Sequence, residues 1–147
     1  MDKKDFINSL ICDEKVEEIL KIPQYKSRVD VIRVIKNHDE SFLLEVSDFY
    51  PSIMERNNGV MPPEEVQRNK TKIENFGTSF YLDNDNSKEV ILSVPTLREN
   101  MKALSYGTIT VKHGLISCPD QTGHLVMYLL DPLNNNLPKK FKYHVEE

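Results

Sequence analysis

The sequence predicts an α+β domain that is mainly β, with short helices before, within and after a set of strands. Two observations carry this prediction. Apolar and polar residues alternate with a period of two in several runs rich in Val, Ile, Leu, Phe and Tyr, which is typical of strands with one buried face. Clusters of Asn, Asp, Gly and Pro separate these runs, and such clusters are typical of turns.

Composition places the chain among ordinary globular proteins. Its 147 residues suffice for one compact domain, with 39% hydrophobic and 29% charged residues. The net charge of −4 is spread along the chain, which counts against tight, non-specific binding of nucleic acid. The two cysteines, Cys12 and Cys118, favour a reducing compartment. With neither a signal-peptide pattern nor a run of about 20 apolar residues, we expect an intracellular protein, cytoplasmic or nuclear, without a membrane partner.

The first 24 residues predict one or two short helices. Asp5 and Asp13 can cap helical turns whose apolar residues recur at helical spacing, and Pro23 closes the segment. We expect the apolar stripe to pack on the protein's own sheet. A partner helix or a membrane is the alternative.

The strongest strand signal lies between residues 28 and 54. A first strand is expected where β-branched residues alternate, with one face made by Val29, Val31, Arg33 and Ile35. After a polar turn at 38–40, a second strand is expected over 42–47 and a third extended segment over 49–54.

Further elements follow in order. A helix is expected from Pro63 to Phe76, with Gly77 at its end. Two strands, 78–82 and 89–94, are joined by a turn that contains Asp83 and Asp85. The remaining elements expected are a capped helix at 96–104, a hairpin of 108–118 against 124–130, and a last strand over 141–145.

Between residues 25 and 94 the predicted order is strand, strand, strand, helix, strand, strand. That is the order of an OB-fold, a five-stranded barrel whose helix lies between the third and fourth strands. We therefore expect a helical segment over 1–24 that packs on the core, an OB-like barrel over 25–94, and a helix and β-hairpin extension over 95–147 of the same compact unit.

The runs VDVIRVI, SFLLEVSD, GTSFYLD and KEVILSV together resemble the N-terminal OB domain of the replication protein A large subunit. The best match is LEVSD, residues 44–48, and the resemblance covers about half the chain. In that family, basic residues on the second strand line a cleft that receives acidic peptides or single-stranded DNA. The matching positions here are Ser41 and Leu43, and Phe49 replaces an expected glycine. The resemblance therefore implies the scaffold and not the cleft.

Basic and aromatic residues on or beside the predicted strands could bind a ligand on that scaffold. Such combinations hold single strands by charge and by base stacking. The candidate contacts are Arg28, Arg33, Lys36, Tyr50, Arg56 and Phe80, with Phe49 and Tyr81 as further stacking candidates. The alternative is that the aromatic rings fill the core and the basic residues are solvated surface.

One predicted hairpin contains several residues with metal-binding or catalytic side chains, namely His113, Cys118, Asp120 and His124. Their spacing matches no zinc pattern, and a strand Cys is usually a small buried hydrophobe. Cys118 with either histidine is the only candidate pair for covalent catalysis, and the chain has neither a Gly-rich phosphate loop nor a G-x-S-x-G turn. We expect no catalytic residue, metal or cofactor.

Three hypotheses for function follow. The first is a non-catalytic, OB-like binding module that grips single-stranded nucleic acid or a partner peptide in nucleic-acid maintenance. The second is a small acidic protein-interaction or inhibitor protein, of the immunity type, that masks a basic partner. The third is an enzyme that uses Cys118 and a histidine, or a carboxylate-bound metal. The first is preferred because it uses a specific topology.

Overall fold

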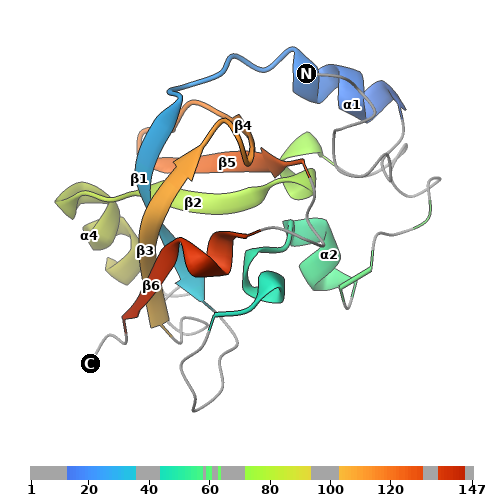
Figure 1. Ribbon diagram of the computed structural model, residues 1–147. Coiled ribbons are helices and arrows are strands. Elements are labelled where there is room, and N and C mark those ends of the chain that lie inside the picture. The colour runs from blue at the N-terminus through green and yellow to red at the C-terminus, as the bar shows by residue number, and fades with distance from the viewer. Residues whose placement is uncertain are drawn as a thin grey trace.

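The computed structural model describes residues 13–35, 44–57, 59–60, 63, 72–93, 103–130 and 136–144. Its centre is one antiparallel sheet of six strands in the order β4-β5-β2-β1-β3-β6 (Figure 1). The strands are β1 (Arg28–Ile35), β2 (Thr78–Leu82), β3 (Ala103–Thr110), β4 (Gly114–Ile116), β5 (His124–Leu129) and β6 (Phe141–His144). The protein is therefore α+β with an open sheet, and an OB-like barrel is not confirmed.

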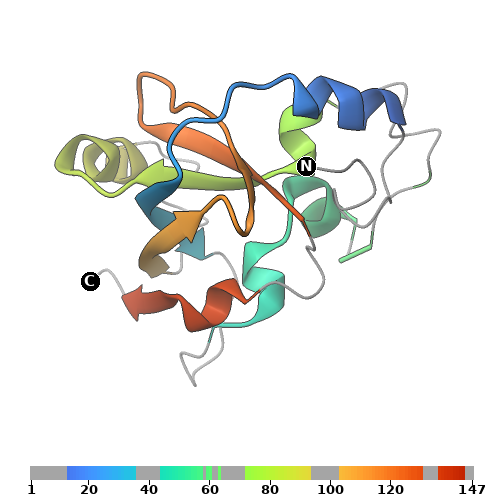
Figure 2. The same ribbon diagram turned by 45° about the horizontal axis from the view of Figure 1, so that its top comes forward.

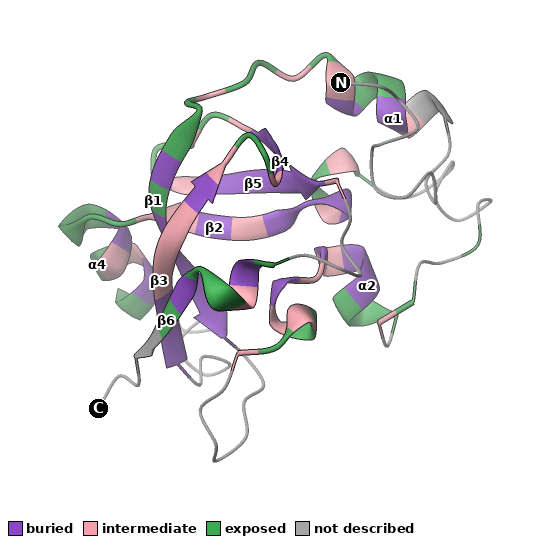
Figure 3. Ribbon diagram, in the orientation of Figure 1, coloured by how far each residue is buried: buried purple, intermediate pink, exposed green. Residues whose placement is uncertain are grey.

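Strand β1 lies in the middle of the sheet, as its β-branched sequence predicts. It pairs with β3 along all eight of its residues and with β2 on its other side. Val31 and Ile32 point to opposite faces, and neither is accessible to solvent. Both faces of the sheet are therefore covered at β1 from Val31 to Ile35 (Figure 3).

The face that carries Val29 and Val31 is filled by three phenylalanine rings. Phe49, Phe80 and Phe141 come from separate segments, and the Phe141 centroid lies 4.8 Å from that of Phe49 and 5.8 Å from that of Phe80. A Cβ on Gly107 would lie 2.6 Å from the Phe141 ring. The glycine therefore lets β6 approach β3 with its first side chain in the core.

The other face is covered by two helices at opposite ends of the molecule (Figures 1 and 2). Helix α4 (Asp85–Ser93) places Ile91 against Ile32, Val34 and Leu104. Helix α1 (Asp13–Leu20) places Val16 and Ile19 in a cluster with Val126 and Tyr128. The sheet thus has two separate apolar clusters on this face.

Short helical segments connect the strands. These are η3 (Val46–Phe49), α2 (Ser52–Arg56), η4 (Ile73–Phe76) and η5 (Leu137–Lys139), where η marks a 3-10 helix. A backbone bond holds the start of α2 to the residue before β2, since the Ser52 amide donates to the Gly77 carbonyl at 3.2 Å. No helix within the described ranges has the length and apolar character needed to cross a membrane.

Several sequence-based predictions are confirmed. The second helical turn of the N-terminal segment is α1, the first predicted strand is β1, the strand over 78–82 is β2, and the last predicted strand begins at Phe141 as β6. The predicted hairpin is partly correct, because β4 pairs with β5. However, β3 begins at Ala103, within the predicted helix 96–104, and it pairs with β1 and β6.

Two predicted strands are wrong. The segment over 49–54 turns into α2 after Pro51, and the run at 89–94 belongs to α4 as far as Ser93. Asn84 explains the second error, because its Oδ1 accepts a bond of 2.8 Å from the Ser87 amide and so satisfies a donor of the first helical turn. Ser87 and Ile91 are buried at a spacing of one helical turn, whereas the run Val90-Ile91-Leu92 is typical of a strand.

Other predictions lie partly outside the described residues. Residues 42 and 43 of the second predicted strand are not described. The described part of this prediction is wrong, because 44–45 are not in a strand and Val46 begins η3. Of the predicted helix over 63–76, only 63 and 72–76 are described, and 73–76 form η4. Residues 96–102 of the predicted short helix and the first turn of the N-terminal helix also lie outside.

Candidate functional site

The six predicted contact residues are not brought together on one surface. Arg28 is exposed at the start of β1, and Arg56 is exposed on α2, where its Nε donates to the Ser52 carbonyl at 3.4 Å. Tyr50 is half-buried against the cluster around α1. Lys36 lies outside the described residues.

Phe80 cannot stack on a ligand in this structure. Its side chain is fully buried, and its ring centroid lies 6.5 Å from that of Phe49 in a stacked arrangement. On an antiparallel strand that is covered on both faces, an aromatic side chain fills the core. The prediction that Phe80 contacts a ligand is therefore wrong for this fold, and the alternative that it is a core residue is correct.

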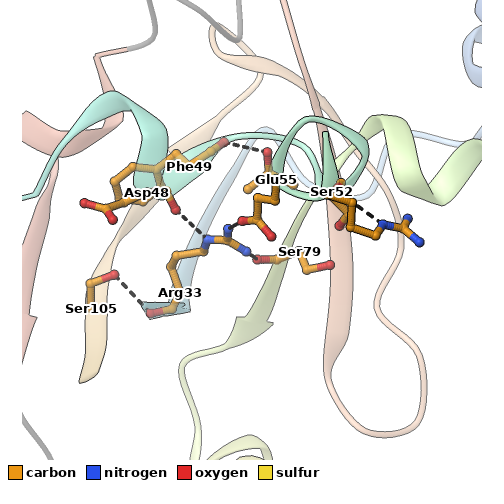
Figure 4. A network of polar contacts seen from close by, with 9 residues as sticks. Arg33, Asp48, Phe49, Ser52, Glu55, Ser79 and Ser105 are labelled. Atoms are coloured by element: carbon orange, nitrogen blue, oxygen red, sulfur yellow. Dashed lines mark hydrogen bonds and ion pairs between the residues drawn. The ribbon is translucent and has the colours of Figure 1, made fainter. Parts of the chain in front are cut away.

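Arg33 is also an interior residue, only 5% exposed. Its guanidinium donates from Nε to the Asp48 carbonyl at 3.0 Å and from Nη1 to the Ser79 carbonyl at 2.9 Å, and Nη2 pairs with the Glu55 carboxylate (Figure 4). The Ser105 hydroxyl donates to the Arg33 carbonyl at 3.1 Å. The side chain therefore joins β1, η3, β2 and α2, which corrects its predicted role in ligand binding.

A group of exposed carboxylates lies together at one end of the sheet. The acidic end consists of Asp30 on β1, Asp83 after β2, Asp85 at the start of α4, and Asp120 before β5. Two backbone bonds bring these segments together: the Asp83 amide donates to the Asp30 carbonyl at 3.1 Å, and the Leu82 amide donates to the Gly123 carbonyl at 2.9 Å.

Helix α4 packs on the same turn that carries Asp120. The Ser87 hydroxyl donates to the Thr122 carbonyl at 3.5 Å, and a Cβ on Gly123 would lie 2.1 Å from the Ser87 Oγ. Gly123 also has a φ of +85°, which favours glycine. The position of α4 relative to Asp120 thus depends on a residue without a side chain.

Three of the four carboxylates are held by neighbouring side chains or amides. Asp30 accepts from the Thr108 hydroxyl at 2.6 Å, and Asp83 lies 3.9 Å from the Lys88 ammonium. One oxygen of Asp120 accepts from the Thr122 hydroxyl at 2.6 Å, the Thr122 amide at 2.8 Å and the His124 amide at 3.1 Å. These contacts orient the carboxylates while leaving the residues exposed.

The charge of Asp120 is stabilised by its turn. Partial burial raises the pKa of its carboxyl, but the bonds from Thr122 and His124 outweigh that effect, so the pKa lies below its ordinary value. The acidic end therefore keeps this negative charge at neutral pH.

Two half-buried rings lie beside Asp120. The Tyr81 and His124 ring centroids are 5.2 Å apart in an edge-to-face arrangement. Burial, and then the charge of Asp120, raise the pKa of Tyr81. Burial lowers the pKa of His124, with Asp120 acting in the opposite direction. Both rings are therefore neutral near pH 7, and the negative charge at this end is not balanced by His124.

The residues considered as zinc ligands do not assemble. Cys118 is exposed, and no group of three or more His, Cys, Asp or Glu within the described part of the chain could hold a metal ion. The His113 side chain is bonded to the backbone, since its Nδ1 accepts a hydrogen bond from the Thr110 amide at 3.2 Å. Burial is the largest effect on its pKa, which is lowered.

The sequence around Asp83 and Asp85 favours a turn. The composition of this turn does not reveal that Asp30 and Asp120 lie beside it, because their position depends on the pairing of β1, β2 and β5.

Comparisons of the chain with protein-family models, with curated proteins and with solved structures find no match. The function is therefore inferred from the chain's own residues.

Proposed function

We propose that this protein is a non-catalytic interaction protein that binds a basic partner protein or peptide at the acidic end and so masks the partner's positive charge. The observation that supports the proposal most is the convergence of Asp30, Asp83, Asp85 and Asp120, from three separate parts of the chain, on one exposed surface.

Electrostatics favour a cationic partner for this surface. Complementary charge accelerates association and suppresses partners of the wrong sign. The net charge of −4 adds to the local field. Because Asp30 and Asp120 are already oriented by Thr108 and Thr122, little side-chain entropy is lost when they pair with a lysine or arginine.

A second candidate is the OB-like module that grips single-stranded nucleic acid. Its support is the exposure of Arg28 and Arg56 and the half-buried ring of Tyr50. Arg28 and Asp30 share one face of β1, so a phosphate at Arg28 would meet the neighbouring carboxylate. The burial of Arg33 and Phe80 leaves this candidate with fewer surface contacts than the acidic end offers.

A titration with defined probes separates the two candidates. Fluorescence anisotropy would be measured with a labelled lysine-rich peptide, a neutral peptide of the same length, and labelled oligo-dT with a duplex control. We expect the protein to bind the lysine-rich peptide with an affinity that falls with added salt, and to bind oligo-dT weakly or not at all.

The D83K/D85K variant tests the location of the site. Four charge units are added, so the net charge rises from −4 to zero, and we expect the affinity for the lysine-rich peptide to fall about tenfold or more. The matched control is E18K/E74K, which makes the same change of charge at two exposed residues, one in α1 and one in η4. Equal loss in both variants would mean that only net charge matters, and the proposal would fail.

A further inference from the structure

At the acidic end, a carboxylate and an aromatic ring already hold a cation, the ammonium group of Lys88. The Lys88 Nζ lies 3.9 Å from the Asp83 Oδ1 and 5.3 Å from the centroid of the Tyr106 ring. A cation within about 6 Å of a ring centroid is attracted by the negative face of the ring. Asp83 follows β2, Lys88 lies in α4 and Tyr106 lies in β3. We call the Asp83 carboxylate and the Tyr106 ring the cation subsite.

The Tyr106 ring is fixed by the core and adjoins a second carboxylate of the acidic end. The ring packs against the apolar cluster that contains Ile32 and Ile91. Thr108, two residues further along β3, points to the same face of the sheet, and its hydroxyl donates to the Asp30 carboxylate at 2.6 Å. The subsite is therefore a fixed, half-buried ring beside oriented carboxylates, a combination that favours an alkyl chain ending in a positive charge.

Lys88 is held in the subsite by contacts that exchange easily. The distance of 3.9 Å between its Nζ and Asp83 is longer than the roughly 2.7–2.9 Å of a charge-assisted hydrogen bond. The Lys88 side chain is 40% exposed and that of Asp83 is 35% exposed, so water and salt screen the pair. Replacing Lys88 by another ammonium group therefore costs little, because the incoming group makes the same contacts and Lys88 is hydrated again.

We propose that the cation subsite binds a lysine side chain of the basic partner, which displaces Lys88. The proposal rests on the proposed function of the acidic end and names the groups that one partner side chain contacts there. The partner residue is a lysine because Lys88 shows that an ammonium on a straight alkyl chain reaches both the carboxylate and the ring. The partner outcompetes Lys88 because its other positive charges pair with the remaining carboxylates of the acidic end.

Removing Lys88 tests the competition. In K88M the subsite is empty before the lysine-rich peptide binds, so the peptide no longer displaces an internal cation. The matched control is K72M, because Lys72 is exposed before η4 and its loss also changes the net charge from −4 to −5. By fluorescence anisotropy we expect K88M to bind the peptide about threefold more tightly than K72M. Equal affinities would overturn the proposal.

The ring tests whether the peptide occupies the same place as Lys88. A lower positive charge near the carboxylates would by itself tighten binding to K88M, but that effect does not depend on an aromatic face. We therefore expect K88M/Y106L to bind the peptide about threefold more weakly than K88M/Y106F, which keeps the ring. Both variants lack the hydroxyl, so they differ only in the aromatic face, and circular dichroism checks their fold. Equal affinities would mean that the peptide does not contact the ring.

The displacement itself is measured by NMR of the unmodified chain labelled with ¹³C and ¹⁵N. The Tyr106 ring current shifts the ε-protons of Lys88 upfield, and we expect the lysine-rich peptide to move these signals toward the position of a free lysine. The ε-protons of Lys72 are the control and should not move. Binding of the peptide with unchanged Lys88 signals would overturn the subsite and leave the proposed function standing. Absence of peptide binding would contradict the proposed function and the subsite with it.

Discussion

Arg33 and the acidic end show two opposite uses of charge within one sheet. The Arg33 guanidinium makes three contacts within the protein and is almost inaccessible. The carboxylates of Asp30, Asp83 and Asp120 have neighbours that orient them, and yet these residues remain exposed. Arg28 is exposed on the same strand although it has the same side chain as Arg33, so the type of side chain does not decide whether a charge is used by the fold or left at the surface. What decides it is whether the fold consumes the hydrogen-bonding capacity of that side chain.

The largest effect is expected where a predicted ligand contact is a core residue. Phe80→Ala removes a fully buried ring that packs on Phe49 and Phe141, and we expect the free energy of unfolding to fall by about 4 kcal/mol. Urea denaturation measures this. Val60→Ala is the control, because Val60 is 62% exposed and should change stability by less than about 0.5 kcal/mol.

Arg33→Met is expected to cost about 3 kcal/mol, because Glu55 loses its buried cation and two backbone carbonyls lose their donor. The same substitution at the exposed Arg28 should have little effect on the urea midpoint. Equal stability of the two variants would show that Arg33 does not hold α2 and η3 on the sheet, and the comparison with the acidic end would fail.

The sequence predicts those features of Arg33 and the acidic end that depend on neighbouring residues, and it does not predict contacts between residues far apart in the chain. The period of two predicts that Arg33 shares a face of β1 with Val29, Val31 and Ile35, so the sequence indicates its position on a buried face. The sequence does not indicate its hydrogen-bond and ion-pair partners, because residues 48, 55 and 79 belong to other elements. The strands with clean alternation, β1 and β6, were predicted for the same local reason.

The sequence predicts a strand where helix α4 lies, because a run of Val, Ile and Leu is typical of a strand. The sequence does not predict the acidic end, because its aspartates come together only through the pairing of distant strands. The Asn84 cap and the contact of Ile91 with Ile32 and Leu104 favour the helix over the local preference for a strand. Asp30 and Asp83 meet only because β1 and β2 pair, which is long-range information.

A smaller effect is expected from pH. Burial lowers the pKa of both His113 and His124 below the ordinary value of 6.5, so the unfolded chain binds more protons than the folded one as pH falls through that value. Stability should therefore be highest above about pH 6.5 and should decline as the pH is lowered to about 5. Urea midpoints across this range measure the slope.

The variant H113N separates the two histidines. The side-chain oxygen of the introduced asparagine can accept a hydrogen bond from the Thr110 amide, as His113 Nδ1 does. Asparagine does not titrate, so it takes up no proton as the pH is lowered. The slope of stability against pH should become shallower, with the remainder due to His124. An unchanged slope would mean that the burial of His113 does not govern its protonation.

The smallest effect on stability is expected at the acidic end. D83K/D85K breaks one exposed ion pair and places a positive charge at the start of α4, so the free energy of unfolding should fall by less than about 1 kcal/mol. Urea denaturation of this variant beside Arg33→Met would sharpen the comparison. A loss as large as that of Arg33→Met would mean that these carboxylates serve the fold.

The central claim is that the acidic end is where a basic partner binds, and an NMR titration of the ¹⁵N-labelled protein with the lysine-rich peptide tests it most directly. The account predicts chemical-shift changes at the amides of Asp30, Asp83, Asp85 and the turn 120–124, with little change at Tyr50 and Arg56. Changes centred on Tyr50 and Arg56, or changes spread evenly over the surface, would contradict it.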